Sequence, residues 1–443
     1  MSLLQQIEPS RLSGALQIVK ALRERGFKAY FAGGAVRDLL LGRSVADIDI
    51  ATSAHPDDVE GLFSRTILVG KEFGVVIVVL DSLNYEVTTF RKESSYIDGR
   101  HPSEVGFTNA REDARRRDFT VNALFLDPFS EEVVDYVGGR EDLEHKLIRT
   151  VGEPAQRFEE DKLRILRALR FACQLGFELD EETFEYVRRY AGQLLRVSWE
   201  RIRDELLKML ASPGPARALD LLSDSGLLTV VLPEVEAMKG VEQPPEFHPE
   251  GDVFKHTRLM LELSGGNLDE SLALGILLHD VGKPPTFAVK ERIRFDGHAE
   301  VGAEMAGAIC RRLRLPNDQT EEVVELVKHH LRFIHVQEMR ESTLKRFLRM
   351  ENFDKHLELH RLDCLSSHRD LRAYNFCREK LEQLSQEAIR PDPLIDGYDL
   401  IDLGFKPGPV FSEILRAVED LQLEGKVASR PEALDWVRRN YSG

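Results

Sequence analysis

The sequence predicts an α+β protein, in which an N-terminal α/β domain is followed by domains built from helices alone. Three observations lead to this prediction. Short β-like runs, separated by turn residues and short helical stretches, are confined to roughly the first 145 residues. From about residue 158 onward, apolar side chains recur at helical spacing instead. A proline-rich stretch at 241–249 interrupts the helical pattern and indicates a domain boundary.

The α/β domain is predicted over residues 1–145. It opens with a helical pattern that ends at Gly26. The β-like runs that follow are bounded by turn residues, and two helical stretches fall between them. The predicted strands are 29–32, 47–51, 66–69, 75–80, 85–90 and 122–126, and the predicted helices are 36–41 and 56–63.

Three helical domains are predicted to follow, because 443 residues are too many for one hydrophobic core. They are a neck over 146–240, a histidine-rich domain over 241–390 and a small tail over 391–443. In the tail, glycine and proline residues form a turn before an amphipathic helix. The helices predicted in the neck are 159–175, 182–190, 199–210 and 215–225.

The composition excludes some classes of protein. A net charge of −16 argues against a protein that coats nucleic acid non-specifically, although a local basic groove remains compatible with it. The sequence has neither a run of ~20 apolar residues nor the pattern of a secretory signal, so no membrane partner is expected. Four scattered cysteines are expected to be reduced thiols in a cytoplasmic protein. The composition does not indicate an oligomeric state.

A glycine pair followed by two aspartates marks the first candidate site. Gly33 and Gly34 lie between a predicted strand and a predicted helix, where the backbone can approach a phosphate closely. Arg37, one turn inside that helix, can reach the same phosphates. Asp47 and Asp49 are two positions apart on a strand, so their carboxylates are expected to project from one face. Paired carboxylates suit Mg²⁺, which supports phosphoryl transfer.

Glu86, on a neighbouring predicted strand, is a candidate third carboxylate. Each of these features also has an ordinary structural explanation. The glycine pair can be a simple turn, the aspartates can end a strand, and Glu86 can occupy an exposed strand position. The order and spacing of the whole set nevertheless indicate a nucleotidyl-transfer site.

Four motifs resemble those of the class II tRNA nucleotidyltransferases and the related poly(A) polymerases. They are GGAVRDLLLG with DID, RRRDFTVNAL, RFEEDKLRILRALRFA and WERIRDELLKML, and they cover roughly residues 30–210 in the order found in that family. The resemblance implies a nucleotidyltransferase head domain and Mg²⁺ as its cofactor. It also implies tRNA as a partner, CTP and ATP as substrates, and pyrophosphate as a product.

The resemblance also implies roles for individual residues. Asp47 and Asp49 resemble the pair that binds the metal, and Gly34 and Arg37 resemble contacts to the incoming triphosphate. A second group resembles the residues that contact the phosphate and ribose of the nucleotide, and it consists of Arg117, Asp118 and Asn122.

The third motif resembles the protein template that reads the base edge, with Asp161 and Arg164 as the reading pair. We expect these two side chains to be neighbours on one face of a helix. Arg167 and Arg170 continue at three-residue steps and are expected to extend a cationic strip. The fourth motif, with Glu200, Arg201 and Glu205, is expected to support the helices rather than to contact the substrate.

The nucleotides that are added are predicted from a narrower resemblance. The stretch between Phe90 and Arg117 resembles a flexible loop that permits the switch from C to A addition in this family. We therefore favour addition of CCA. Addition of A only, addition of CC only and poly(A) synthesis remain alternatives. A catalytically inactive RNA-binding protein is an alternative of another class.

A second candidate site follows from a pattern of histidine and aspartate in the order H…HD…D. Imidazole and carboxylate ligands from separate helices can form a divalent-metal centre that activates water for phosphoester hydrolysis. The pattern resembles the HD phosphohydrolase superfamily, including HD domains fused to some bacterial CCA-adding enzymes. The implied ligands are His256, His279, Asp280 and Asp363, with His298 and either His329 or His330 at a second metal position.

The expected substrates of this second site are phosphate monoesters or 2′,3′-cyclic phosphates. Two alternatives remain open. The HD fold can be degenerate and purely structural, or it can carry the principal activity of the chain. The tail resembles the C-terminal region that helps to hold the tRNA body in this family.

Overall fold

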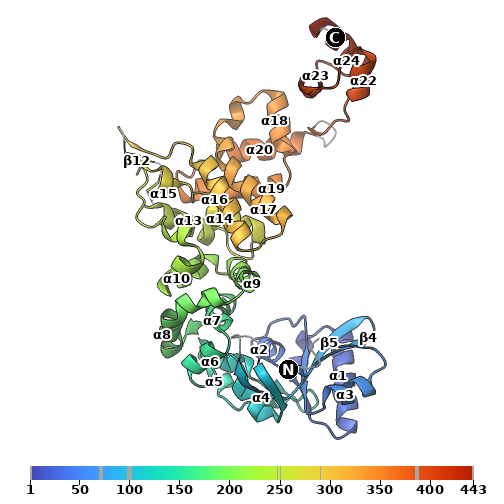
Figure 1. Ribbon diagram of the computed structural model, residues 1–443, viewed down its shortest axis with the longest axis vertical. Coiled ribbons are helices and arrows are strands. Elements are labelled where there is room, and N and C mark those ends of the chain that lie inside the picture. Colours follow the sequence, from blue (N-terminus) through green and yellow to red (C-terminus); the bar gives the residue numbers. More distant parts are fainter. Residues whose placement is uncertain are drawn as a thin grey trace. The chain divides into compact units, whose positions relative to one another are not determined.

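The computed structural model describes residues 2–68, 73–96, 102–246, 248–249, 251–289, 291–384 and 389–441. The chain divides into two compact units, Met1–Glu236 and Ala237–Gly443 (Figure 1). The finer division into four domains stays a prediction. Among the described residues, no helix is both long enough and apolar enough to cross a membrane.

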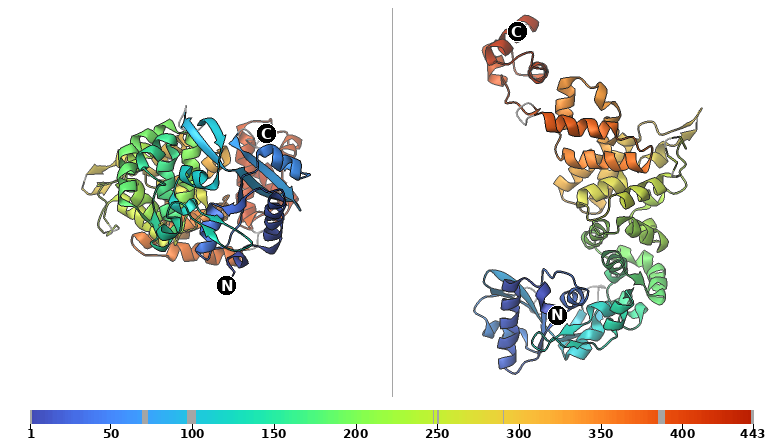
Figure 2. Two further views of the ribbon diagram at one scale, coloured as in Figure 1. Left: turned by 90° about the horizontal axis from the view of Figure 1, so that it is seen from below. Right: turned by 180° about the vertical axis from the view of Figure 1, so that it is seen from behind.

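A mixed seven-stranded sheet forms the centre of the head. Its strand order is β3-β4-β5-β2-β1-β8-β9. Only β2 and β5 are parallel among these neighbours. Helix α1 (Pro9–Glu24) packs against the sheet through Ala15, Ile18 and Leu22 (Figures 1 and 2). The strands are β1 (Ala29–Ala32), β2 (Asp49–Thr52), β3 (Thr66–Ile67), β4 (Val75–Leu80), β5 (Leu83–Thr89), β8 (Phe125–Leu126) and β9 (Val133–Val134).

The turn between β1 and α2 (Gly34–Leu40) places the glycine pair at the C-terminal end of β1, an interior strand of this sheet. Gly33 has φ +69°, a left-handed conformation that favours glycine. Asp49 is the first residue of β2 and pairs in register with Glu86 of β5. Because the two strands are adjacent and in register, these two side chains lie on the same face of the sheet.

Two predictions for the rest of the head are corrected. The predicted strand at 122–126 is wrong at its start, because Thr120–Asn122 form a 3₁₀ turn before β8. The stretch predicted as a loop holds two antiparallel strands, β6 (Arg91–Tyr96) and β7 (Pro102–Phe107), and then helix α4 (Ala110–Arg116). Residues 97–101, which join the two strands, lie outside the described part of the chain.

The helix predicted over 159–175 is broken at Asp161. Helix α6 (Pro154–Glu160) ends there, and α7 (Leu163–Leu175) begins two residues later. Asp161 is extended, with φ −140°, and its side chain accepts a hydrogen bond from the backbone N–H of Leu163. A bond from an aspartate side chain to the backbone two residues later competes with the hydrogen bonds of a continuous helix.

The remaining described elements of the N-terminal unit are two short strands, three helices of the head and the helices of the neck. Helices α7 and α9 pack side by side. Beyond those already given, the elements are η1 (Leu3–Gln6), α3 (Pro56–Leu62), α5 (Gly139–Glu144), β10 (Leu147–Ile148), β11 (Glu178–Leu179), α8 (Glu181–Tyr190), η4 (Ala191–Arg196), α9 (Trp199–Leu210), α10 (Pro215–Asp224), α11 (Leu227–Val231) and α12 (Pro233–Glu236).

Among its described residues, the C-terminal unit is helical, as predicted, apart from a short strand pair, β12 (Ala288–Val289) with β13 (Ile293–Arg294). Its core helices are α13 (Val253–Leu263), α14 (Glu270–Leu278), α15 (Lys283–Thr286), α16 (His298–Arg312), α17 (Asn317–His329), η5 (His330–Glu338), α18 (Glu341–Leu348), α19 (Phe353–Ser366) and α20 (Arg372–Gln383).

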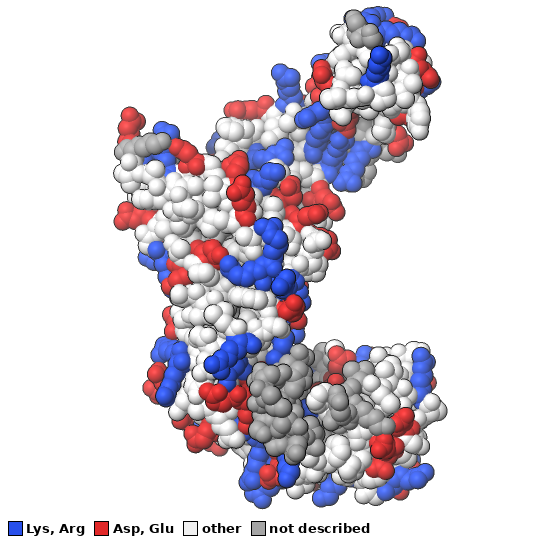
Figure 3. Space-filling model, in the orientation of Figure 1, with Lys and Arg blue, Asp and Glu red and all other residues white. Residues whose placement is uncertain are grey.

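The last three helices have an apolar cluster of their own, which includes Leu400, Ile414 and Val437. They also contact α18 through ion pairs, since Arg346 binds both Glu419 and Asp420. Lys and Arg side chains gather in several local patches on the drawn face of each unit, although the whole chain is acidic (Figure 3). These helices are α22 (Gly397–Asp402), α23 (Pro409–Leu423) and α24 (Arg430–Asn440).

Candidate active sites

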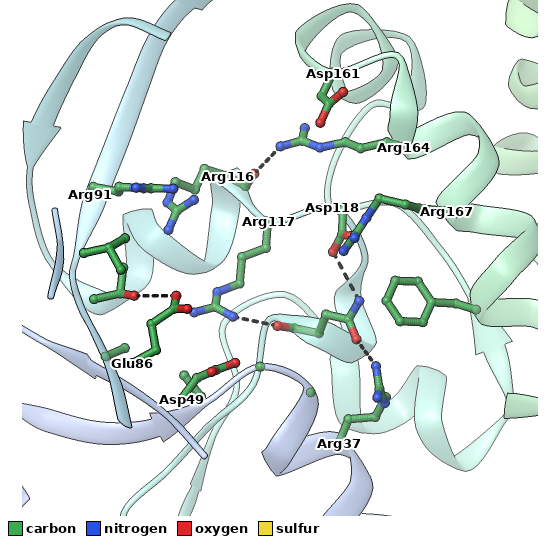
Figure 4. A pocket seen from close by; sticks show the side chains of 18 of the residues that line it. Arg37, Asp49, Glu86, Arg91, Arg116, Arg117, Asp118, Asp161, Arg164 and Arg167 are labelled. Carbon is green, nitrogen blue, oxygen red and sulfur yellow. Dashed lines mark hydrogen bonds and ion pairs between the residues drawn. The ribbon is translucent and has the colours of Figure 1, made fainter. Parts of the chain in front are cut away.

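The first candidate site is a cavity of about 550 Å³ in the N-terminal unit, between the sheet and residues of α7 and α9 (Figure 4). Seven arginines and four carboxylates line it, so the cavity is suited to a polyanion such as a triphosphate. The arginines are Arg37, Arg91, Arg116, Arg117, Arg164, Arg167 and Arg201, and the carboxylates are Asp49, Glu86, Asp118 and Asp161.

Asp49 and Glu86 stand together on the sheet side of this cavity (Figure 4). The pKa of Asp49 is raised to about 6, mainly by burial and then by the negative charge of Glu86. The guanidinium of Arg117 opposes this shift. Two crowded carboxylates repel each other when both are ionised, and a divalent cation between them would remove that repulsion. Their oxygen donors therefore fit Mg²⁺.

Asp47 is placed differently from the prediction. Its side chain is 88% exposed and pairs with Arg11 at 3.2 Å, and it is not among the residues that line the cavity. It still lies close enough to raise the pKa of Asp49. An exposed ion pair contributes little to stability, so Asp47 can exchange Arg11 for a metal ion at small cost. The role of Asp47 as a metal ligand stays a prediction.

A hydrogen-bonded chain joins the glycine turn to α7 through the residues predicted to bind the nucleotide. Arg37 donates to Asn122 Oδ1 at 2.6 Å, and Asn122 donates to Asp118 at 3.2 Å. Asp118 accepts in turn from Arg167 at 2.6 Å. Burial alone would raise the pKa of Asp118, but the charges of Arg167 and Arg164 hold it well below its usual range. The structure thus gathers these predicted groups into one network.

Asp113 is a residue that the sequence interpretation missed. It is 1% exposed, on α4, and one of its oxygens accepts from Arg116 at 2.8 Å while the other accepts from Arg117 at 3.2 Å. It also accepts from the backbone N–H of Arg91. One buried carboxylate therefore orients two cavity arginines and ties them to strand β6. The spacing of three and four residues on a helix was the signal for these pairs.

The Asp113→Asn substitution is expected to lower the free energy of unfolding by about 3 kcal/mol, because it breaks a buried ion-pair group. Burial would raise the pKa of Asp113, but Arg116 and Arg117 hold it below its usual value of 3.8. A depressed pKa stabilises the fold above that value, and the contribution disappears as the pH falls through the folded-state pKa. Urea unfolding at pH 7 and pH 3 measures this, and an equal difference from wild type at both values would contradict the assignment.

The predicted base-reading pair also lines the cavity, although the two residues do not share one helix. Arg164 is held in place by hydrogen bonds to Glu160 at 2.7 Å and to the carbonyl of Arg116 at 3.1 Å. Arg170, predicted to extend a cationic strip, lies outside the lining and bonds to Glu205 and to Gln174 instead. Its contacts are therefore structural ones within the neck.

The second candidate site consists of two groups of metal-ligating side chains in the C-terminal unit. In each group, one donor atom from every residue lies within 4.8 Å of the others. His256 Nε2 is 3.2 Å from Asp363 Oδ1, and His298 Nε2 is 3.5 Å from Asp280 Oδ1. Mixed imidazole and carboxylate donors suit divalent transition metals. The groups are His256, His279 and Asp363, and Asp280, His298 and His330.

Three of these imidazoles are oriented in the same way. The Nδ1 of His279, of His298 and of His330 each contacts the carbonyl oxygen three residues earlier, at 2.6 to 2.8 Å. Because a carbonyl can only accept, Nδ1 carries the proton and Nε2 keeps its lone pair for a metal. Burial lowers the pKa of His330 to about 4, which keeps this imidazole neutral.

His329 is not brought to either group. Its Nε2 lies 3.0 Å from Glu325, and its ring faces His356. Of the two neighbouring histidines that the sequence left open, the structure therefore places His330 with Asp280 and His298. The pocket beside the two groups has a volume of about 760 Å³ and is lined by cations as well as apolar side chains, among them Lys283, Arg292, Arg294, Phe295 and Ile334.

Gly282, two residues after Asp280, allows the segment that carries Asp280 to lie close to the start of α16, which carries His298. A Cβ at this position would clash with the carbonyl oxygen of His298 and lie 2.6 Å from the backbone nitrogen of Gly302. Both contacts are to the backbone of α16, which cannot move without moving His298.

The Gly282→Ala substitution is expected to lower the free energy of unfolding by about 3 kcal/mol, as overpacking does, and to reduce the metal content of the protein. Thermal unfolding and elemental analysis measure the two effects. Gly307→Ala in α16 is the control, because its new Cβ meets only side chains, the nearest being Arg311. An unchanged unfolding temperature for Gly282→Ala would show that α16 is free to shift.

Three family models match the chain. Residues 29–149 match the poly A polymerase head domain, and residues 176–239 match a probable RNA and SrmB- binding site of polymerase A. Residues 252–365 match the HD domain. The cavity lies largely within the first of these matches, and all six residues of the two metal-ligating groups lie within the third.

Relatives of known sequence and structure agree with these matches. The CCA-adding enzymes of Bacillus pumilus (strain SAFR-032) and Bacillus subtilis (strain 168) are 52% and 49% identical over 214 residues. These residues are 48% of this chain and 53% and 54% of the two relatives, so the chain spans about half the length of the curated relatives it matches.

Among solved structures, the Bacillus stearothermophilus CCA-adding enzyme in complex with CTP superposes with a TM-score of 0.74 at 29% identity, over 98% of both chains. The Thermotoga maritima CCA-adding enzyme complexed with tRNA has a TM-score of 0.61 at 20% identity, over 99% of this chain and 97% of that one. The latter likeness concerns the fold alone.

The head fold and its arginine-lined cavity match a head domain of the poly(A) polymerase type, and the head is followed by an HD domain. The N-terminal unit matches two domain models of the poly(A) polymerases, and the whole chain resembles the solved CCA-adding enzyme of Bacillus stearothermophilus in fold. The resemblance predicted from the four motifs is therefore confirmed, as is the prediction of an α/β head followed by helical domains.

Proposed function

We propose that this chain adds CCA to the 3′ end of tRNA, using CTP and ATP and releasing pyrophosphate. The observation that carries the proposal is one cavity lined by four carboxylates and seven arginines, among which Asp161 and Arg164 form the base-reading pair. Relatives named CCA-adding enzymes, one of them solved with CTP, support the choice of substrates. The described cysteines are buried and unpaired, which agrees with the cytoplasmic location that we propose.

In the proposed reaction, the tRNA 3′-oxygen forms a bond to the α-phosphorus while the bond from that phosphorus to the bridging oxygen of pyrophosphate breaks. Little covalent chemistry is needed from the protein, so positioning and charge stabilisation dominate. Mg²⁺ held by Asp49, with Asp47 and Glu86 nearby, would supply Lewis-acid stabilisation of the reacting oxygens. Arg37, Arg117 and Arg167 would hold the triphosphate against the glycine turn.

The base would be selected by Asp161 and Arg164. Cytosine and adenine both present an amino donor beside a ring nitrogen acceptor, whereas uracil and guanine present a carbonyl oxygen in place of the amino group. The carboxylate of Asp161 can accept from the amino group while the guanidinium of Arg164 donates to the ring nitrogen. This pair therefore accepts C and A and rejects U and G.

The test uses tRNA that ends in the discriminator base, in C or in CC, with CTP and ATP supplied separately and together. Sequencing of the products is expected to show completion to CCA and no further growth. A long A tail would identify a poly(A) polymerase. A single added A, or two added C residues, would identify the narrower enzymes. No extension of any substrate would favour an RNA-binding protein without catalysis.

A second function is favoured by the two groups of metal-ligating residues. We propose that the HD domain binds divalent metal and hydrolyses phosphate monoesters or 2′,3′-cyclic phosphates. His256, His279 and Asp363 would hold one ion, and Asp280, His298 and His330 a second, supplying an activated water. The cationic side chains of the adjoining pocket would bind the phosphate. Metal-stimulated release of phosphate from monoesters, or opening of cyclic phosphates to monophosphates, tests this.

A further inference from the structure

The geometry of the neck assigns a part in base selection to Arg201, a residue of α9 that the sequence places in a supporting motif. We propose that Arg201 is a positioning residue that fixes the direction in which Asp161 accepts a hydrogen bond from the nucleobase. The inference rests on the proposed function of Asp161 and deepens it.

The first support is the pair of bonds that Asp161 makes. Its Oδ2 accepts from Arg201 Nη2 at 2.8 Å, and its Oδ1 accepts from the backbone N–H of Leu163 at 3.0 Å. A carboxylate offers about four lone-pair sites, so acceptor capacity remains on both oxygens. Because each oxygen is held by a different donor, the carboxylate cannot rotate freely. Both Asp161 and Arg201 line the nucleotide cavity.

The second support is the position of Asp161 in the chain. Asp161 lies in the extended link between α6 and α7, not within a helix. Its partner Arg164, in contrast, is already held by Glu160 and by the carbonyl of Arg116. Arg201, which lies outside the link, therefore fixes the carboxylate of Asp161 beside a guanidinium of Arg164 that is already held in place.

The third support is the pattern of charge on α9. Arg201 and Glu205 are four residues apart and face the same way. Arg201 pairs with Asp161, while Glu205 pairs with Arg170 and lies 3.8 Å from Arg167. Helix α9 therefore places the cation of Arg201 beside Asp161 and the anion of Glu205 beside Arg170, at the two ends of the template segment 161–170. This arrangement holds the template in one register relative to the cavity.

The test compares Arg201→Met with Arg201→Lys, and uses Arg203→Met as the matched control. Arg203 lies on the same helix, pairs with Asp204 and is not among the cavity residues. Single-nucleotide extension of tRNA is measured with CTP, ATP, UTP and GTP. Arg201→Met is expected to lower the preference for CTP over UTP, as a ratio of kcat/KM, by about tenfold. Arg201→Lys is expected to recover part of it, and Arg203→Met is expected to match wild type.

A double-variant cycle separates positioning from a structural role. If Arg201 acts through Asp161, then Arg201→Met adds little to the loss of preference caused by Asp161→Asn. Full additivity, or an equal loss for all four nucleotides together with a lowered Tm, would overturn the proposal. So would an Arg201→Met enzyme with the selectivity of wild type.

Equilibrium binding of CTP and UTP to the free protein gives a second readout. Failure of the wild type to extend tRNA would sink the proposed function but not this inference. The binding preference and its loss in Arg201→Met are still expected in that case. Equal binding of CTP and UTP by the wild type would overturn the inference itself.

Discussion

Replacing Asp49 with asparagine is expected to lower nucleotide addition by about a thousandfold while the fold is retained. Asp49 is the carboxylate that the structure places inside the cavity, next to Glu86 and opposite the arginines. The amide has nearly the same shape but no charge to hold a divalent cation. Incorporation of labelled CMP into tRNA lacking its end measures the effect.

Asp81→Asn is the matched control for this variant. Asp81 is an exposed residue in the turn between β4 and β5, on the same sheet. Its positive φ is one that asparagine tolerates, so the substitution should leave both stability and activity unchanged. If Asp49→Asn kept appreciable turnover with an unaltered Tm, the carboxylates at the edge of β2 and β5 would not be the metal site.

Replacing His279 or Asp363 with alanine is expected to abolish metal-stimulated phosphoester hydrolysis and to leave nucleotide addition intact. Both residues belong to the first metal-ligating group, and removing one of three donors from such a site removes most of its affinity. Elemental analysis is expected to show one bound ion fewer per chain. Release of phosphate from a nucleoside monophosphate, or opening of a nucleoside 2′,3′-cyclic phosphate to the monophosphate, gives the activity.

The neighbouring pair His329 and His330 offers a control within the same segment. His330→Ala is expected to lose the ion held with Asp280 and His298. His329→Ala should keep the metal content of the wild type, because its imidazole pairs with Glu325 instead. Equal metal loss in both variants would refute the division into two groups. Hydrolysis that persists without any metal would refute the whole assignment.

The sequence was sufficient where function depends on residues close together in the chain. The strand at β1, the glycine turn after it and the strand at β4 follow directly from local patterns. The histidine and aspartate donors of the HD segment were also recognised from the sequence, by their order: His256, His298 and Asp363 lie in helices, and the adjacent pair His279 and Asp280 follows α14. These features are fixed by propensity and burial over a few residues.

The sequence was not sufficient to predict local structure where a side chain bonds to nearby backbone or to a residue distant in the chain. Periodicity predicted an unbroken helix through Asp161, because the pattern does not reveal that this aspartate accepts from Leu163 and from Arg201. In the same way, the alternation that placed Asp47 beside Asp49 does not reveal that Arg11 competes for Asp47. Such outcomes depend on tertiary contacts, which periodicity does not encode.

Each of three metal-facing imidazoles takes its tautomer from a carbonyl three residues earlier, and this has a consequence for how the centre tolerates change. The carbonyl in the same segment fixes which nitrogen of each imidazole can bind a metal. The packing of the segments against one another then sets the distances between these nitrogens. Since each group takes its donors from different segments, a substitution that disturbs the packing of α14, α16 or η5 would change the distances between donors and lower the affinity for metal without changing the tautomers.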